Sequence, residues 1–536
     1  MNTVIYNPLE EFDGKFKDLH RENTEKVFEN LVQRSGVNIE ENRETVRQYN
    51  ELKNNLEELK KKLKLLKFLR VLMCITIVLI PVVILKTTPQ IKELKIKIEE
   101  ADRRAEELLA IAYNQMIPLN HLFTERDAVN IIESTIPLLS FDPCFVAKKE
   151  ADMIINYDFC EHDEKEQSTV AVLSGNYNEN PFIFENKLIH QMGVCTYHGS
   201  LTVTWTETYR DSKGIRRTRT RSQTLHASVV KPKPYYHTQV VLNYCAQGGP
   251  DLSFYRDASH LEQKSEKELE RFIKRGEKNL SKMNDRAIKE NSDFVSMSNS
   301  EFEVLFDALN RTNEVQFRTL FTPLAQTNMT ALIRSKNGFG DDFNFIKEKR
   351  TNRIISNHSQ GRAINLEPKD YISYSFDIIK ESFVQKNIDF FKAVYFDFAP
   401  LLAIPVYQER PVHSLEPIPD YSQKYSYKEC EVLANAVDPH YVVSPLTKTQ
   451  AILKSAFVDS KDGIDRTRIT AYSYNIIKRT DYIPVRAMNG ICYNVPVGWD
   501  DYIPLEASKD FFVSSSELAA DKTVIGMRNG LSIYQY

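Results

Sequence analysis

The chain has 536 residues, an apolar fraction of 42% and a net charge of −3. The composition is ordinary for globular protein, and the length is sufficient for more than one domain with its own core. The near-neutral charge excludes a strongly basic chain of the kind that coats nucleic acid, so no nucleic-acid partner is expected.

Residues 1–40 are predicted to form a small helical N-terminal cap. Apolar residues recur at helical spacing over Phe16–Ser35, and Gly36 ends the pattern. Glycine is common just beyond the last turn of a helix, because it adopts the left-handed conformation without steric cost.

The uncharged run Val71–Leu85 is the most distinctive segment of the sequence. It extends to Leu65–Leu85 if Lys67 and Arg70 reach the headgroups, which gives a helix of roughly 31 Å. We therefore predict one transmembrane helix near 65–85 and a lipid bilayer as partner. The alternative is a buried hairpin helix with its turn at Lys86–Gln90.

Apolar residues at spacings of three and four flank this run on both sides, within a predicted coiled coil over residues 41–117. The two patterns are in register, which favours a single long helix over residues 43–116 and a parallel homo-oligomer. In the alternative interpretation the seam packs on the chain's own domains. The predicted oligomer seam consists of Leu52, Leu56, Leu59, Leu63, Leu66, Ile91, Leu94 and Ile98.

The lysines and arginines between Lys60 and Arg70 are denser than those after the apolar run. Basic residues mark the cytoplasmic side of a span, so the predicted localisation is a single-pass membrane protein with a cytoplasmic N-terminus.

A helical connector is predicted over residues 118–167, and an antiparallel sheet with helices over residues 168–356. Leu201–Tyr209 alternates strictly and is rich in strand-forming residues. Asp211–Gly214 is a turn, and Ile215–Val230 is the returning strand. The Lys231-Pro-Lys-Pro234 stretch is expected to end that strand, with Tyr235–Cys245 as another.

Residues 357–536 are predicted to form a second α+β domain. Helices are expected at about Phe376–Phe391 and Tyr427–Ala436, and strands at about Arg466–Ile477 and Val485–Val495. The predicted fold class is therefore α+β: a long helix with one transmembrane segment, a mostly antiparallel β-rich domain and a second α+β domain.

The returning strand is basic. Arg217, Arg219 and Arg221 alternate and so share one face of the strand, with Lys213 nearby. Trp205 is on the partner strand. Such a face could bind phospholipid headgroups or nucleic acid; the alternative is a charged, solvated face that guards an edge. We take Lys213, Arg217, Arg219 and Arg221 as candidate contacts to an anion or lipid.

No residues are identified as catalytic, cofactor-binding or metal-binding, and no cofactor is expected. The sequence lacks the glycine-rich, nucleophile-elbow and zinc-helix motifs of common enzymes. Cys195 and Cys245 could pair in an exported domain; otherwise they are free thiols.

Val458–Thr467 resembles the phosphate-binding loop of myotubularin-type phosphatases. That chemistry requires a cysteine six residues before the arginine, and this chain has Ser460 before Arg466. The surrounding alternation favours a structural turn.

Two further resemblances concern longer segments. Ser174–Phe184, Asn299–Glu303, Phe317–Pro323 and the Phe343–Ser356 hairpin resemble an uncharacterised bacterial membrane-associated family of unknown function. Leu31–Arg43 is similar to hypothetical proteins of mollicutes and other low-GC Gram-positive bacteria. The resemblance implies membrane attachment and no known activity.

Taken together, the sequence predicts a non-enzymatic, membrane-anchored scaffold or recognition protein that oligomerises through the helices flanking the span. The alternative is a module that docks on anionic lipid, an envelope component or an unknown protein through its basic hairpin. An enzyme with an unrecognised site is the third possibility.

Overall fold

The computed structural model describes residues 4–535 except 75–86, 144, 146, 161–163, 211, 291–293, 337, 412–425, 462–463, 515–523 and 529–530. It divides into two compact units. Unit 1 comprises residues 9–139 and 365–396, and unit 2 comprises residues 3–8, 140–364 and 397–536. The helix α12 (Phe376–Leu402) begins in unit 1 and ends in unit 2.

Unit 1 is helical. Its buried core brings together aromatic and aliphatic side chains of α2, α5 and α12, including Phe28, Leu119 and Phe383. Gly36 has a φ of 64° and ends α2, which confirms the predicted boundary. The helices and turns that precede α12 are α1 (Pro8–Glu11), η1 (Phe12–Phe16), α2 (Lys17–Ser35), α3 (Ile39–Cys74), α5 (Thr88–Asn120) and α6 (Asp127–Thr135).

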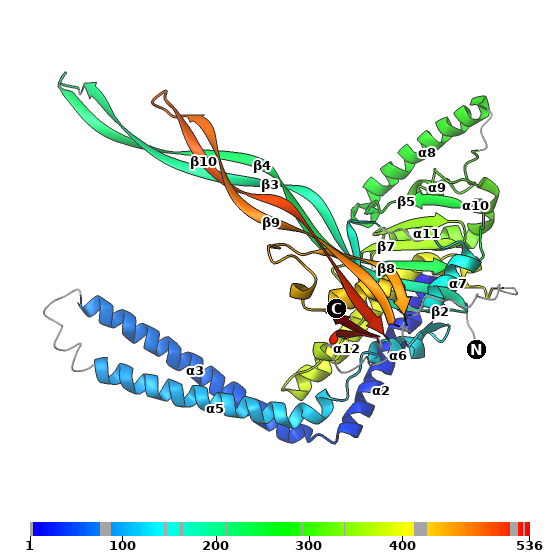
Figure 1. Cartoon of the computed structure of the whole chain (residues 1–536), viewed down its shortest axis with the longest axis horizontal. Coiled ribbons are helices and arrows are strands. Elements are labelled where there is room, and N and C mark those ends of the chain that lie inside the picture. The colour runs from blue at the N-terminus through cyan, green and yellow to red at the C-terminus, as the bar shows by residue number, and fades with distance from the viewer. Residues whose placement is uncertain are drawn as a thin grey trace. The chain divides into compact units, whose positions relative to one another are not determined.

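Helices α3 and α5 run antiparallel beside each other (Figure 1). The Asn42 side chain donates to the Ala112 carbonyl at 3.3 Å, and Lys60 Nζ donates to Asp102 Oδ1 at 3.0 Å. Residue numbers therefore rise along α3 as they fall along α5, so the predicted single helix over residues 43–116 is wrong.

The residues of the predicted oligomer seam are wholly or partly buried within the single chain. Leu56, Ile91 and Ile98 are buried, and the other five are half-buried. A heptad pattern defines the apolar face of a helix but not the direction of the helix that covers it, which is why the pattern was misinterpreted. Self-association through this seam stays an untested prediction.

The predicted membrane anchor is also corrected. In the described part of the chain, no helix is long and apolar enough to cross a membrane. The helix α3 ends at Cys74 and α5 begins at Thr88, and residues 75–86, which hold most of the apolar run, lie outside the described residues. The predictions of a single-pass membrane protein and of a cytoplasmic N-terminus both depended on this span, so the structure does not support them.

Unit 2 contains two antiparallel sheets, which agrees with the predicted α+β class. The first sheet has the strand order β1-β2-β3-β4-β7-β6-β5. Its strands are β1 (Leu139–Phe141), β2 (Gln167–Tyr177), β3 (Asn180–Arg210), β4 (Arg216–Cys245), β5 (Ser253–Arg256), β6 (Phe343–Glu348) and β7 (Thr351–Gln360).

The second sheet has the order β11-β12-β10-β9-β8. Its strands are β8 (Ile452–Lys461), β9 (Ile464–Arg486), β10 (Cys492–Ser514), β11 (Val524–Arg528) and β12 (Leu531–Gln535). The helices of unit 2 are α7 (Ala147–Tyr157), α8 (Glu266–Glu290), α9 (Ser300–Phe306), α10 (Glu314–Leu320), α11 (Pro323–Arg334) and α13 (Tyr427–Ala436).

Two strands of each sheet continue far beyond their neighbours and form an arm (Figure 1). We define the arm as residues 191–235 of the β3–β4 hairpin and residues 474–504 of the β9–β10 hairpin. The strand β4 continues without a break through Lys231–Pro234, so the predicted end of the strand is wrong. Proline is compatible with a strand that has a free edge, because only the donor to a ladder is missing.

The two hairpins of the arm pack on each other. Val203 and Leu225 of the first hairpin and Ala487 and Val495 of the second are buried in one apolar cluster. A Cβ built on Gly199 would lie 2.1 Å from the Pro496 carbonyl oxygen, so the backbones approach closely there. The base of the arm is therefore two layers thick.

Candidate functional site

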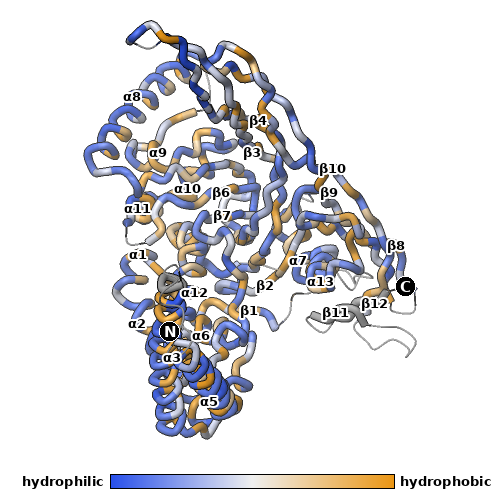
Figure 2. Tube along the Cα trace, turned by 90° about the vertical axis from the view of Figure 1, so that its left-hand side faces the viewer, coloured by the Kyte–Doolittle hydropathy of each residue, from blue (hydrophilic) through white to orange (hydrophobic). Residues whose placement is uncertain are grey.

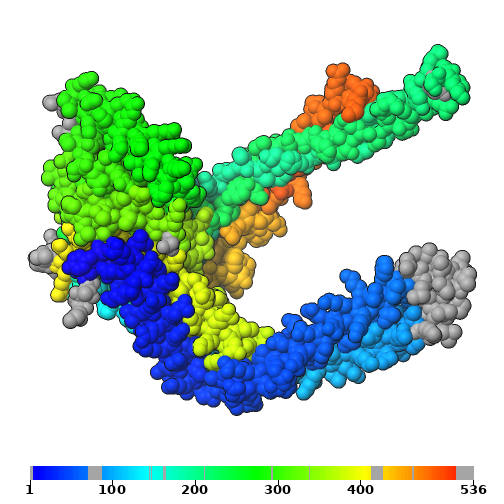
Figure 3. Space-filling view, turned by 180° about the vertical axis from the view of Figure 1, so that it is seen from behind, coloured from blue at the N-terminus to red at the C-terminus, as the bar shows by residue number. Residues whose placement is uncertain are grey.

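The first hairpin projects beyond the second (Figures 1 and 3). The turn of the second hairpin lies level with Gln223, whose Oε1 accepts a hydrogen bond of 2.8 Å from the Met488 backbone N–H. We define the basic tip as residues 206–221, which follow the last apolar contacts between the hairpins. It holds six basic residues against two acidic ones in a chain whose net charge is −3.

The register of β3 and β4 decides which side chains of the tip share a face. Tyr209 pairs with Arg217, and Glu207 pairs with Arg219. Because side chains alternate along a strand, these pairs lie on the face that carries the apolar cluster at the base.

Two of the predicted contact residues are engaged by one carboxylate. Arg219 Nη2 lies 3.1 Å and Arg221 Nε 2.7 Å from Glu207 Oε2. Trp205 Nε1 donates to the other oxygen of Glu207 at 3.1 Å. The Arg219 guanidinium also lies 5.2 Å from the centre of the Tyr209 ring. The structure thus brings Arg219 and Arg221 together and partly neutralises them, with Lys213 and Arg217 at the end of the same hairpin.

The opposite face of the tip carries a pair that the sequence interpretation missed. Arg210 and Arg216 are directly opposite each other across the two strands, and both are exposed. Neither guanidinium group makes a hydrogen bond or ion pair with any residue that the structure describes. Like charges at directly opposed positions destabilise a hairpin, so this pair breaks a local rule of strand pairing.

Hydroxyl groups continue this face towards the base of the arm. Thr202 is paired with Thr224, and their Oγ1 atoms lie 3.1 Å apart. Three further cross-strand pairs complete an exposed ladder: Thr204 with Ser222, Thr206 with Thr220, and Thr208 with Thr218. A strip of hydroxyls therefore leads to two guanidinium groups that have no partner in the described part of the chain.

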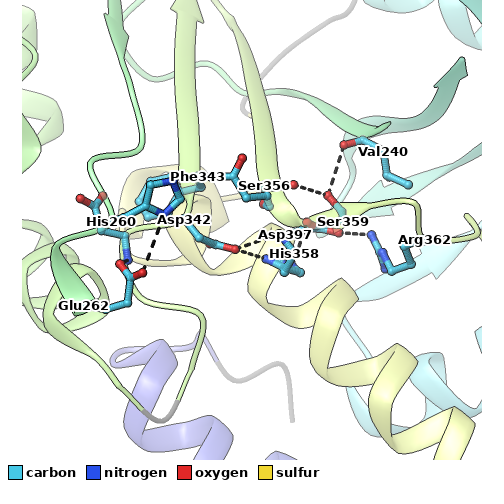
Figure 4. A network of polar contacts seen from close by, with 12 residues as sticks. Val240, His260, Glu262, Asp342, Phe343, Ser356, His358, Ser359, Arg362 and Asp397 are labelled. Atoms are coloured by element: carbon cyan, nitrogen blue, oxygen red, sulfur yellow. Dashed lines mark hydrogen bonds and ion pairs between the residues drawn. The ribbon is translucent and has the colours of Figure 1, made fainter. Parts of the chain in front are cut away.

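A second polar cluster lies inside unit 2 (Figure 4). His358 of β7 has its Nδ1 2.6 Å from Asp342 Oδ2 and its Nε2 3.3 Å from Asp397 Oδ1. Arg362 forms an ion pair with the same Asp397, and the His358 ring stacks on Phe339 with 3.8 Å between centroids.

Burial would lower the pKa of His358, but its hydrogen bonds to Asp342 and Asp397 and their charges raise the pKa to about 9. Burial would raise the pKa of Asp397, yet the Arg362 charge and the His358 contact hold it below the ordinary value. Both ring nitrogens are occupied, so the ring has no nitrogen free to accept a proton from a substrate. We assign this cluster to stability.

The other sequence candidates for chemistry are spread along the structure. Cys195 lies opposite Lys231 in the arm, whereas Cys245 is buried at the end of β4, and both are free thiols. The loop that resembles a phosphatase connects β8 and β9, with Ser460 opposite Asp465 and Arg466 paired to Asp459 at 2.6 Å. Among the described residues, no group of three or more His, Cys, Asp or Glu side chains could hold a metal ion.

The basic tip is therefore the candidate site that the structure supports best. Its existence is visible in the sequence, whereas the Arg210–Arg216 pair follows only from the register of the hairpin. The resemblances to an uncharacterised bacterial family and to mollicute proteins stay predictions. Comparison of the chain with family models, with curated proteins and with solved structures finds no match.

Proposed function

We propose that this protein is a non-enzymatic recognition module that docks on a linear phosphodiester polymer through the basic tip of its arm. One observation carries the proposal: Arg210 and Arg216 are opposed, exposed and without a partner among the described residues. An anion bridging two guanidinium groups removes the repulsion that the free hairpin otherwise retains.

The hydroxyl ladder favours phosphodiester over carboxylate as the partner chemistry. Serine and threonine hydroxyls contact phosphate oxygens alongside arginine in nucleic-acid interfaces, and they position the protein along the backbone. Here the ladder from Thr202–Thr224 to Thr208–Thr218 leads directly to the arginine pair. A linear polymer laid along the ribbon would meet hydroxyl donors first and guanidinium groups at the end.

The shape of the tip supports the same proposal. A two-stranded ribbon is slim enough to enter the major groove of a duplex or to lie along a single strand. The expectation of no nucleic-acid partner rested on the net charge of the whole chain, but the charge is unevenly distributed and six basic residues gather at the tip. Two sources supply this chemistry: nucleic acid, or a polyol-phosphate polymer of a cell envelope.

The test is fluorescence anisotropy of the full chain with three labelled polymers of equal length. A single-stranded oligonucleotide and poly(glycerol phosphate) represent the two sources, and polyglutamate supplies carboxylates. We expect at least one phosphodiester polymer to bind, and polyglutamate to bind more weakly. Binding of both at equal strength would assign recognition to the phosphodiester itself, and binding of one would identify the source.

The variant that tests the arginine pair is Arg210→Gln/Arg216→Gln. Removing two phosphate contacts should lower the slope of log K against log salt by about 1.4, since each contact to a single strand contributes about 0.7. The matched control is Lys267→Gln/Lys274→Gln, which removes the same charge from exposed positions on α8 of the same unit. Equal losses in both variants, or preferred binding of polyglutamate, would refute the proposal and favour an acidic protein as partner.

A further inference from the structure

A hollow lies along the first turns of α8, the helix that stands beside α9 in Figure 1. It has a volume of about 610 Å³ and lies between α8 and the segment from Ser259 to Lys264. Four residues of α8 line it at spacings of three and four, so they share one face of the helix. They are Glu268, Arg271, Phe272 and Arg275.

The hollow is positively charged. The ammonium group of Lys264 and the guanidinium groups of Arg271 and Arg275 make no hydrogen bond or ion pair with any described residue. The one acidic side chain of the lining, Glu268, accepts hydrogen bonds from the backbone and hydroxyl of Ser265 at the start of α8. Three cations and one carboxylate therefore line one concave space, and the charges of Lys264 and Arg271 help to lower the pKa of Glu268. The lining keeps an excess of positive charge, whereas arginine and lysine on a flat surface are ordinarily solvated singly.

His260 closes one side of the hollow in an unusual backbone conformation. Its φ is 51° and its ψ 42°, the left-handed region that residues with a side chain seldom adopt. Its Nδ1 lies 3.7 Å from Glu262, and its Nε2 lies 3.3 Å from the Asn357 amide nitrogen. Such conformations persist where the surroundings hold them, and they gather at binding sites.

A second hollow of about 380 Å³ adjoins the first, because both are lined by Phe272 and Arg275. This one is mainly apolar, with contributions from Leu280, Met283 and Val304. Its acidic members do not reverse that character. Glu303 is buried in an ion pair with Arg311, and Asp307 lies at the surface.

We propose that the two hollows together form a binding site for one small anionic amphiphile. Its phosphate or carboxylate head would lie against Lys264, Arg271 and Arg275. Its apolar body would pass Phe272 into the hollow lined by Leu280 and Met283. Ligand pockets of a few hundred Å³ commonly combine an apolar wall with a small number of polar groups that orient the ligand. This site is independent of the arm and of the function proposed for it.

Isothermal titration calorimetry of the full chain tests the proposal with octyl phosphate and nonanoate. Inorganic phosphate and octanol serve as probes that carry only one half of the ligand. We expect an amphiphile to bind at least about tenfold more tightly than either half, because charge-assisted hydrogen bonds and apolar burial add. Preference for octyl phosphate or for nonanoate would identify the head group. Equal binding of inorganic phosphate would reduce the site to a simple anion site and overturn the proposal.

Variants locate the site. Arg271→Gln/Arg275→Gln should weaken octyl phosphate binding by about tenfold or more, since two charge-assisted contacts are lost. Lys267→Gln/Lys274→Gln changes the same charge on the same helix outside both hollows and should leave binding unchanged, as should Arg210→Gln/Arg216→Gln on the arm. Met283→Gln should weaken octyl phosphate but leave inorganic phosphate unaffected. Unaltered binding of octyl phosphate to the Arg271/Arg275 variant would refute the site.

Discussion

At the scale of single residues, the charged groups inside unit 2 illustrate how burial and partners compete. His358 is held between two carboxylates, and its charged form is stabilised although the side chain is nearly inaccessible to water. Lys347 shows the opposite balance. It has no carboxylate partner among the described residues, and burial lowers the pKa of its ammonium group to about 7. The ordinary pKa of a residue type therefore says little about either position.

The raised pKa of His358 gives a prediction for stability against pH. Its pKa is 6.5 in the unfolded chain and about 9 in the folded protein. The stabilisation by the charged ring is complete below pH 6.5 and is lost as the pH rises through 9. The contribution of His358 to the free energy of unfolding should fall by up to about 3 kcal/mol over this window, because one pKa unit corresponds to about 1.4 kcal/mol.

Urea unfolding of the full chain across this window measures the effect. His358→Gln should remove this part of the pH dependence. His226→Gln, which changes an exposed histidine of the arm, should retain it. An unchanged pH profile in His358→Gln would show that another group is responsible.

The basic tip also shows which features of a site can be predicted from the sequence of one strand. Alternation places Arg217, Arg219 and Arg221 on one face, and the structure confirms that placement. The partnership of Arg219 and Arg221 with Glu207 depends on the register between two strands. So does the opposition of Arg210 and Arg216. Register is set by the turn and by packing against the second hairpin, which a single strand pattern does not reveal.

At the scale of elements, Gly199 allows the two hairpins of the arm to approach closely. An added Cβ would lie 2.1 Å from the carbonyl oxygen of Pro496, a backbone atom that cannot move aside alone. Gly199→Ala should therefore separate the hairpins locally and destabilise the protein by about 1–3 kcal/mol, the usual range for overpacking.

Intrinsic fluorescence reports this change selectively. The chain has two tryptophans, Trp205 and Trp499, and both are in the arm. Their emission should shift to longer wavelength in Gly199→Ala as water enters the interface. Gly14→Ala is the matched control, because a Cβ at Gly14 would contact nothing within 4 Å. If both variants show the native emission and stability, the close approach of the hairpins is not needed for the arm.

Prolines protect the free edges of the arm. In their hairpins, Pro232 lies opposite Val194 and Pro484 lies opposite Asn494, in stretches where each strand has one partner strand only. Proline has no N–H, so it reduces the row of donors that an edge would offer to another chain. The same two ladders contain three more prolines, Pro234, Pro496 and Pro504. Each lies an even number of pairs from Pro232 or Pro484 and therefore in the same type of antiparallel pair.

Restoring the donors should make the arm associate. Pro232→Thr/Pro484→Thr introduces a strand-forming residue at two exposed positions and adds two edge N–H groups. We expect sedimentation velocity to show dimers or larger species that increase with protein concentration. Thr202→Val/Thr204→Val is the comparison, since it changes an exposed face without altering backbone donors. A monomer at all concentrations would contradict the protective role.

Helix and strand positions could be predicted from the sequence to different extents. The α13 boundaries agree with the prediction, and the β3–β4 turn lies where Asp211–Gly214 predicted it. The antiparallel association of α3 with α5 was predicted only as the alternative hairpin. Both helices carry the same apolar period, and the period does not show in which direction a helix runs. The two hollows beside α8 were missed because the helical pattern of α8 does not show which other residues pack against it. The first hollow depends on the preceding segment from Ser259 to Lys264, and the second on residues from Glu303 to Leu309.

At the scale of the whole molecule, the two units share the chain in an interleaved manner. Residues 365–396 belong to unit 1 although they follow most of unit 2 in sequence. Phe376, Ile379 and Phe383 of α12 pack in the core with Phe28 and Leu119. A cut at one point in the chain therefore cannot separate the units without exposing part of a core.

A fragment of residues 140–536 should accordingly aggregate. It retains the apolar side chains of α12 but lacks the helices that cover them, and large exposed apolar patches promote association. We expect little soluble fragment on gel filtration, and recovery of soluble material when residues 1–139 are produced in the same cells. A monomeric, soluble fragment that needs no second piece would contradict the shared core.

The stepped construction of the arm has a mechanical consequence. Its base is a laminate of two twisted ribbons joined by apolar contacts, whereas beyond Trp205 one ribbon continues alone. A single two-stranded ribbon is marginally stable by itself and bends easily, whereas a laminate resists bending. The base of the arm is thus stiff, and its end bends easily. A force applied to the end that carries the arginines first bends the last residue pairs of the single ribbon. It reaches the sheets at the base of the arm only after that bending is complete.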